Sequence, residues 1–458
     1  MSQTQADLGS GKVGKLLFSL SLPTITSQVV NMLYNLVDRV YIGHMQPADT
    51  VGKLALTGVG VCLPVIMVIS AFAALMAMGG APRASIQEGR GNPAEAERIM
   101  GNCLTLLVIT SLVLTAAIQL FAEPLLLAFG ASANTLGYAS SYLRIYSLGT
   151  LFVQLTLGMN AYITAQGFTT VSMRTVLIGA ILNTILDPIF IFGLGLGVRG
   201  AALATILSQA VSASWVLRFL TGRRTKWRIR RANLRPRAAV VLPCLALGMS
   251  PFIMQSTESL IAMCFNTSLL KYGGDIAVGA MTVLTSIMQL AMMPLQGLTQ
   301  GCQPIVSYNY GARNAQRVRE AFRLLLRCCV IYSMAMWALV QLFPGAFARI
   351  FNSDAEMVSY ASWAMRIYMA ATGIFGIQIA CQQTFVALGN AKASLFLAVL
   401  RKIILLIPLI YILPNFFADK VFAVFLAEPA ADTLAVIATA TTFALQFRPA
   451  MARLEEGE

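Results

Sequence analysis

The sequence GGAPRASIQEGRGN at residues 79–92 returns in the second half of the chain as GCQPIVSYNYGARN at residues 301–314. Aligned without a gap, the two segments share a glycine, a proline, a serine, a second glycine and an asparagine. The coincidences continue at the same offset, because Gln119-Leu120-Phe121 falls on Gln341-Leu342-Phe343. Self-similarity of this kind predicts a fold made of two copies of one structural unit.

Apolar residues dominate the composition and come in blocks. Of the 458 residues, 57% are hydrophobic and 11% are charged, whereas soluble domains carry roughly 25% charged residues. The blocks are about 20 residues long, the length of a helix that crosses the hydrocarbon layer of a membrane. We therefore predict an all-α integral membrane protein of about twelve transmembrane helices, with no soluble domain left over. The predicted spans are 16–43, 55–80, 99–121, 141–164, 175–196, 201–221, 239–268, 277–304, 324–343, 362–387, 395–416 and 421–447.

The repeat divides these spans into an N-terminal lobe (1–217), a basic cytoplasmic linker (218–238) and a C-terminal lobe (239–458). Each lobe contains an even number of spans, so both lobes enter the membrane in the same orientation. We expect two parallel six-helix lobes around a central cavity, related by an axis along the membrane normal. This arrangement suits a transporter that works by alternating access.

The net charge of +14 follows the connections between the spans. Lys and Arg gather in every second connection, and the densest run lies in the linker. By the positive-inside rule the rich side is cytoplasmic, so we predict that both termini are cytoplasmic. The linker is expected to touch anionic lipid and not nucleic acid, whose footprint would lie on a soluble basic face. Segment 1–14 lacks the apolar core of a signal peptide, and we expect none to be removed.

Motifs for catalysis and for metal binding are not visible in the sequence. His44 is the single histidine, and the eight cysteines form no C-x-x-C pair. A transition-metal site would need clustered His or Cys ligands, and direct use of ATP would need a P-loop. An enzyme within the membrane would need a converging nucleophile, base or metal. We therefore expect no enzyme activity, no cofactor, and no metal beyond a possible coupling ion.

Acids inside the predicted spans are the strongest functional signal. We place three there: Asp38, Asp187 and Glu258. An ionisable group at the bilayer centre costs about 2.5–3.5 kcal/mol, so such groups mark functional sites more often than structural pairs. A polar stripe on one face of the first helix is expected to line the cavity. Its members are Gln28, Asn31, Asn35 and Asp38.

The fifth span carries a set of oxygen ligands. Asn183 and Asp187 are four residues apart and therefore lie on one helical face. Pro188 cannot donate a hydrogen bond to the carbonyl of Thr184, which leaves that oxygen free. Amide, carbonyl and carboxylate oxygens are the ligands that a hard cation such as sodium selects. The same carboxylates could bind a proton instead, and two acids close together would titrate as a coupled pair.

The second half carries a different polar set. The residues expected to face substrate or water there are Gln255, Glu258, Gln289 and Met292. Each polar side chain could instead bond between helices, and methionine also fills gaps in apolar helices. Proline inside a span marks a bend, and we predict that Pro23 is a hinge of the first helix.

At five places the sequence resembles the MATE family of multidrug and toxin exporters, especially the bacterial branch with an acid in the first helix. They are NMLYNLVDRVYIG (31–43), PRASIQEGRGN (82–92), TAQG (164–167), NTILDPIFIFGLGLGVRGAALATILSQ (183–209) and PIVSYNYGARN (304–314). The resemblance covers essentially the whole chain. It implies efflux of cationic or amphipathic drugs from the bacterial cytoplasm across the inner membrane, driven by a proton or sodium gradient. It also implies that a coupling ion binds Asp38, Asn183, Asp187 and Thr205.

One departure from the family pattern places this coupling site. Another branch uses acids in helices seven and ten; this chain has Glu258 in the former, but no acid occurs between Met357 and Ala418. We therefore place coupling in the N-terminal lobe. We also expect a monomer.

Two other transporter classes are alternatives. A flippase for lipid-linked saccharides would need a basic cavity for pyrophosphate, and the predicted stripes contain amides and acids. A porter of the major facilitator type shares parallel lobes, but the loop signature of that family after helix two is missing.

Overall fold

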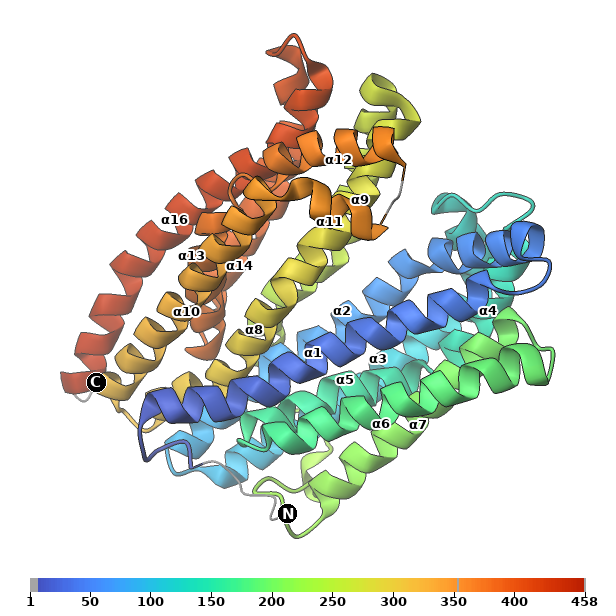
Figure 1. Cartoon of the computed structure of the whole chain (residues 1–458). Coiled ribbons are helices and arrows are strands. Elements are labelled where there is room, and N and C mark those ends of the chain that lie inside the picture. Colours follow the sequence, from blue (N-terminus) through green and yellow to red (C-terminus); the bar gives the residue numbers. More distant parts are fainter. Residues whose placement is uncertain (1–6, 352–353, 457–458) are drawn as a thin grey trace.

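The computed structural model describes residues 7–351 and 354–456, and its regular elements in these ranges are all helical (Figure 1). The elements of the first half are α1 (Val13–Gly43), a π-helical turn (Ala48–Gly52), α2 (Lys53–Gly89), α3 (Pro93–Ala128), α4 (Leu136–Leu148), α5 (Thr150–Ala165), α6 (Thr169–Pro188), a second π-helical turn (Ile189–Gly193), α7 (Val198–Thr221) and a short 3-10 turn (Arg231–Asn233). Those of the second half are α8 (Ala238–Ser256), α9 (Glu258–Gly311), α10 (Ala315–Leu342), α11 (Pro344–Phe351), α12 (Ala355–Tyr368), α13 (Thr372–Ala387), α14 (Ala391–Val399), the π-helical η4 (Leu400–Leu406), α15 (Ile407–Ile412), a 3-10 turn (Leu413–Asn415) and α16 (Lys420–Glu456).

These helices give the membrane passes that the hydropathy predicts. In the described ranges, nine helices are long and apolar enough to cross a membrane, or ten if the bent pair α12 and α13 is one span. The stretch from α8 through α9 counts once in that total, although the chain turns back at Gly274, where the backbone leaves the helical region (φ 69°) (Figure 1). The fourth predicted span (141–164) corresponds to α4 and α5, which are divided at Gly149.

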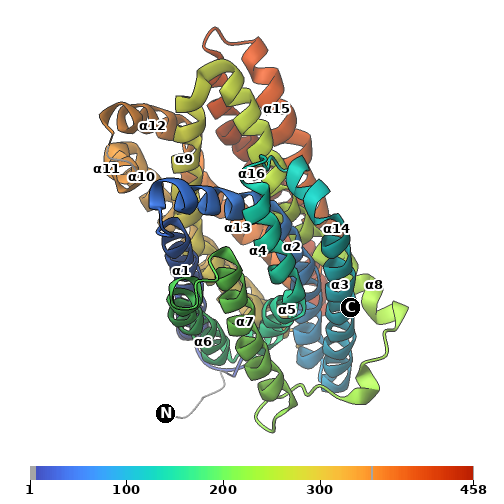
Figure 2. The same cartoon turned by 90° about the vertical axis from the view of Figure 1, so that its right-hand side faces the viewer.

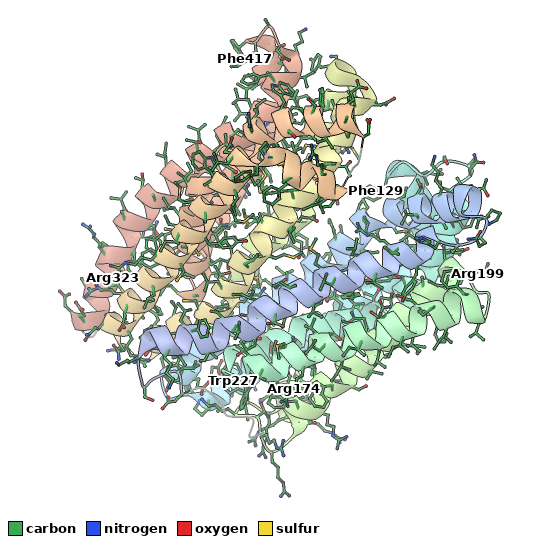
Figure 3. All side chains as sticks on the ribbon, viewed as in Figure 1. Phe129, Arg174, Arg199, Trp227, Arg323 and Phe417 are labelled. Atoms are coloured by element: carbon green, nitrogen blue, oxygen red, sulfur yellow. The ribbon has the colours of Figure 1, made fainter. Side chains whose placement is uncertain are left out.

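The helices form two lobes that meet at one end of the molecule and diverge toward the other (Figures 1 and 2). The first lobe contains α1 to α7, and the second contains α8 to α16. Figure 3 places Arg174, Trp227 and Arg323 at the end where the lobes meet, and Phe129 and Arg199 at the other. The start of α1 and the end of α16 lie with the first group (Figure 1). This agrees with an even number of passes.

Glycines allow the two lobes to touch main chain to main chain. A Cβ atom on Gly89 of α2 would lie 2.0 Å from the carbonyl oxygen of Tyr308 in α9. A Cβ atom on Gly311 of α9 would lie 2.0 Å from the carbonyl oxygen of Ile86 in α2. Only a residue without a side chain fits so close an approach. Gly89 and Gly311 are equivalent positions of the sequence repeat, and so are Ile86 and Tyr308. The two contacts are therefore reciprocal, and a pseudo-two-fold axis relates the lobes.

Hydrogen bonds inside each lobe repeat in the same way. The Ser85 hydroxyl donates to the carbonyl of Ala165 (3.3 Å), and its counterpart Ser307 donates to the carbonyl of Ala387 (2.7 Å). Serine and glycine therefore recur in the repeat because they make the same contacts in both lobes.

The linker packs on the cytoplasmic end predicted for the N-terminal lobe. The side-chain oxygen of Gln166 accepts hydrogen bonds from the Thr225 hydroxyl (2.8 Å) and from the main-chain N–H groups of Lys226 (2.8 Å) and Trp227 (3.0 Å). Trp227 is completely buried. The linker is thus an ordered strap that covers the first lobe before the chain enters the second.

Residues 7–12, which precede α1, form the matching strap on the C-terminal lobe. Asn309 donates to the carbonyl of Leu8 (2.9 Å), and Arg317 donates to the carbonyls of Gly11 (2.7 Å) and Ser10 (3.1 Å). The Asp7 carboxylate accepts hydrogen bonds from the Ser10 hydroxyl and from the N–H of Gly9, which close a turn. These hydrogen bonds lower the pKa of Asp7. Leu8 is buried in the core of the C-terminal lobe. Each lobe is therefore covered by the segment that leads into the other.

Candidate functional site

Three neighbouring helices of the N-terminal lobe bring the predicted ion-binding residues together. Asp38 lies on α1, Asn183 and Asp187 lie on α6, and Thr205 lies on α7. Figure 2 shows α1, α6 and α7 along one side of this lobe. Because α6 packs against both α1 and α7, the four residues come together around α6.

Asn183 connects the members of this site. Its amide nitrogen donates to a carboxylate oxygen of Asp187 (3.2 Å) and to the hydroxyl oxygen of Thr205 (3.4 Å). The Thr205 hydroxyl donates in turn to the carbonyl of Ala201 (3.0 Å). Asp38 interacts electrostatically with Asp187. The structure therefore brings together the four side chains that the sequence singles out, and their role in ion binding stays a prediction.

Several oxygen atoms of the site are buried and accept no hydrogen bond from the described residues. They are Oδ1 of Asp38, Oδ1 of Asn183 and Oδ2 of Asp187. Two adjacent carboxyl groups repel each other when both are ionised, so a proton or a cation between them is stabilised. Unpaired carboxylate and amide oxygens around one point also match the ligand preference of a hard cation.

The other residues predicted on α1 do not share in this site. The amide of Gln28 donates to Gln300 of α9 (3.1 Å), so Gln28 joins the two lobes. Asn35 donates to the carbonyl of Asn31 (2.7 Å), and both side chains are exposed. The helix continues through Pro23 without a break, so the role of Pro23 as a hinge stays a prediction.

The residues predicted to line a cavity in the second half are dispersed. Gln255 is half-buried in α8, and Gln289 is exposed on α9. Met292 is 8% exposed and belongs to the apolar core of the C-terminal lobe, so we do not retain it as a cavity residue. Glu258 has a different environment, because it is part of a group of buried charges.

This group, which we name the C-terminal charge cluster, contains Glu258, Arg401, Lys402, Glu428 and Asp432. Lys402 donates to Glu258 (2.5 Å). Arg401 donates to Asp432 (2.7 Å) and to Glu428 (3.1 Å), and its guanidinium lies over the ring of Phe375, 4.4 Å from the centroid. Arg401 and Lys402 lie in η4, and Glu428 and Asp432 lie in α16. All except Glu258 are buried.

The cluster corrects two expectations. The sequence predicts three acids inside spans, but Glu428 and Asp432 also lie within α16. The sequence also predicts that Lys and Arg gather in the connections, whereas Arg401 and Lys402 lie inside a span. The four-residue spacing of Glu428 and Asp432, on one helical face, was the available signal. Their partner Arg401 could not be assigned from local spacing.

The sequence also matches a known protein family, and this match agrees with the fold. The chain matches the MatE family over residues 23–189 and 251–412. This protein belongs to the MatE family. The two matched segments fall in corresponding parts of the two lobes, as the internal repeat requires.

The similarity to other proteins covers almost the whole length of this MatE chain. Multidrug export protein MepA of Staphylococcus haemolyticus is 24% identical over 425 residues, 92% of each chain. A protein named FAD transporter from Shewanella oneidensis is 26% identical over 441 residues, 94% of each chain. A crystal structure of MATE in the bent conformation superposes with a TM-score of 0.89 at 23% identity, over 98% of this chain and 97% of that chain. The MatE protein is therefore a multi-pass membrane transporter with the fold of that structure.

Proposed function

We propose that this MatE protein is a multidrug exporter that moves organic cations or amphipathic drugs outward in exchange for protons or sodium ions. The observation that carries the proposal is the meeting of Asp38 and Asp187, two membrane-embedded carboxyls with unpaired oxygen atoms. A relative over almost the full length is named a multidrug export protein, which supports drugs as the cargo.

Occupancy of the site would set the direction of transport. With Asp38 and Asp187 ionised and no proton or cation between them, the lobe carries uncompensated negative charge that attracts a cationic cargo. A proton or sodium ion from outside neutralises the pair and favours release of the cargo. A monovalent charge that crosses 100 mV supplies about 2.3 kcal/mol, enough to shift an equilibrium about fiftyfold.

The orientation follows from the charges. We infer that the end with Arg174, Trp227 and Arg323 faces the cytoplasm of a bacterial cell and that the protein is in its inner membrane, because basic side chains remain on the cytoplasmic side. The diverging ends of the two lobes would then face outward (Figure 3).

Transport of tetraphenylphosphonium by purified protein in proteoliposomes tests the proposal. An imposed proton or sodium gradient should accelerate its movement, and Asp38→Asn or Asp187→Asn should reduce that acceleration at least about tenfold, since each removes a charge that the coupling ion balances. Asp275→Asn changes an exposed acid at the turn of α9 and is the matched control. Undiminished gradient response in both site variants, with normal gel-filtration profiles, would reject the assignment.

A flavin dinucleotide is a second candidate cargo. It is suggested by the relative named FAD transporter. The same proteoliposomes, loaded with FAD in place of the organic cation, distinguish the two cargoes. Export of FAD without movement of tetraphenylphosphonium would favour the dinucleotide.

A further inference from the structure

The C-terminal charge cluster occupies the same three spans of its lobe as the ion site does in the other lobe. Asp38, the Asn183–Asp187 pair and Thr205 lie on the first, fifth and sixth spans of the first lobe. Glu258, the Arg401–Lys402 pair and Glu428 lie on the first, fifth and sixth spans of the second. The two sites differ in one respect. Among the described residues no basic side chain forms an ion pair with Asp38 or Asp187, whereas the carboxylates of the second lobe are paired with two cations of the chain itself.

The two cations are restrained to different degrees. Arg401 is bound by Asp432 and Glu428 and covered by Phe375, so it is fixed from several sides. Lys402 is bound by one carboxylate, that of Glu258, to which its ammonium group donates a hydrogen bond. An ammonium group is a point charge on a flexible chain, whereas a guanidinium forms a rigid fork with several donors. Lys402 is therefore the cation that can change its partner.

Glu258 is the member of the cluster that a ligand can reach. Its side chain is 49% exposed, whereas that of Lys402 is 6% exposed. The next residue, Ser259, contacts the sulfur of Met67 in α2 of the other lobe (3.6 Å). The exposed carboxylate thus lies beside the contact between the lobes.

We propose that Lys402 is a tethered counter-ion that binds Glu258 when no cargo is present, and that a cationic cargo binds by displacing it. The proposal rests on the export of organic cations proposed above and adds the residue that determines which cations are accepted. A cargo cation must interact with Glu258 more favourably than Lys402 does, so weak or neutral ligands are rejected.

A second carboxylate of the cluster interacts with the ammonium group of Lys402. Lys402 acts electrostatically on Glu428, which shares the single guanidinium of Arg401 with Asp432. The cluster contains three carboxylates and two cations, so one negative charge is not compensated by the chain. When cargo binds Glu258 and Lys402 turns to Glu428, every buried charge still has a partner, and the penalty of an unpaired buried charge is avoided.

Binding of tetraphenylphosphonium to the purified transporter, measured by calorimetry in detergent without any gradient, tests this exchange. Lys402→Met should tighten binding about tenfold, because the competitor is gone. Lys402→Arg should weaken it, because a guanidinium offers the carboxylate two hydrogen bonds. Lys392→Met, an exposed lysine at the start of α14, should leave the affinity unchanged. The double variant Lys402→Met with Glu258→Gln should lose the gain.

The outcomes separate the two proposals. If the wild type binds the cation and neither Lys402 variant alters the affinity, Lys402 is only structural and the exchange is wrong, while export stands. If the wild type and all variants fail to bind any organic cation, the proposed cargo is wrong and the exchange falls with it. If Lys402→Met does not fold, the sign of the change in Lys402→Arg decides, and equal or tighter binding in that variant overturns the exchange.

Discussion

Gly311 of α9 lies against the main-chain carbonyl of Ile86 in α2, so closely that a Cβ atom would approach that oxygen to 2.0 Å. Gly89 makes the equivalent contact with Tyr308. Because the obstacle is helix main chain, it cannot turn aside as a side chain would. These glycines therefore set how closely the lobes approach at the end where they meet.

Gly311→Ala should force the lobes apart at this end. Overpacking costs about 1–3 kcal/mol, so we expect a lower unfolding temperature and a longer distance between spin labels placed on the two lobes near this end. Gly60→Ala is the control, because a Cβ atom there meets no other atom within 4 Å. An unchanged label distance in Gly311→Ala would show that the contact does not limit the approach.

Thr205→Val should separate sodium coupling from proton coupling. The substitution preserves shape but removes the hydroxyl that accepts from Asn183, and a hard cation needs that oxygen whereas a proton on a carboxylate does not. We expect sodium-driven efflux to fall about tenfold and proton-driven efflux to persist. Thr205→Ser keeps the hydroxyl and should behave as the wild type under both gradients. Equal loss under both gradients would instead assign Thr205 a structural role.

Arg401→Met should destabilise the protein strongly. It leaves Glu428 and Asp432 buried without their partner, and breaking a buried ion pair on one side costs about 3–5 kcal/mol. The variant with Arg401→Met, Glu428→Gln and Asp432→Asn together removes all three charges and should recover most of the loss. Thermal unfolding in detergent, followed by tryptophan fluorescence, compares the two. A triple variant less stable than the single variant would contradict this account.

Gln166→Leu should loosen the linker. It leaves the N–H groups of Lys226 and Trp227 without their acceptor, and each unsatisfied buried donor costs about 1–3 kcal/mol. Trypsin should then cleave the linker, which is rich in Arg, severalfold faster than in the wild type. The control is Gln341→Leu, which removes a hydrogen bond to the carbonyl of Arg366 at the other end of the molecule. Equal cleavage rates would mean that other contacts anchor the linker.

The arrangement of the spans could be predicted because hydropathy and the repeat are properties of the sequence alone. The proximity of the residues proposed to bind the ion could also be predicted in large part, since Asn183 and Asp187 are one helical turn apart and the family resemblance supplied Asp38 and Thr205. The breaks within the spans were less predictable. Proline was expected to mark them, yet α1 is continuous at Pro23, and breaks occur at Gly149, between α4 and α5, and at Thr257, between α8 and α9.

The C-terminal charge cluster could not be predicted, for a physical reason. A charge inside a span is tolerated only if a partner neutralises it, and that partner can lie anywhere in the chain. Lys402 pairs with Glu258 from a different span, and Arg401 pairs with acids on α16. Hydropathy averages over neighbours in sequence, so it places these residues inside spans without identifying their partners. The folded structure decides which of these residues form ion pairs, and their spacing in the sequence does not specify the partners.

The exchanged straps bear on how a chain of this design could originate. Residues 7–12 cover the C-terminal lobe, and the linker around Trp227 covers the N-terminal lobe. Two identical six-helix subunits in a symmetric dimer would make the same reciprocal contact, each with its leading segment folded onto its partner. Fusion of the two genes would convert one leading segment into the linker and leave the other as the start of the chain. An ancestral homodimer thus accounts for a contact pattern that a single lobe, folding alone, would not need.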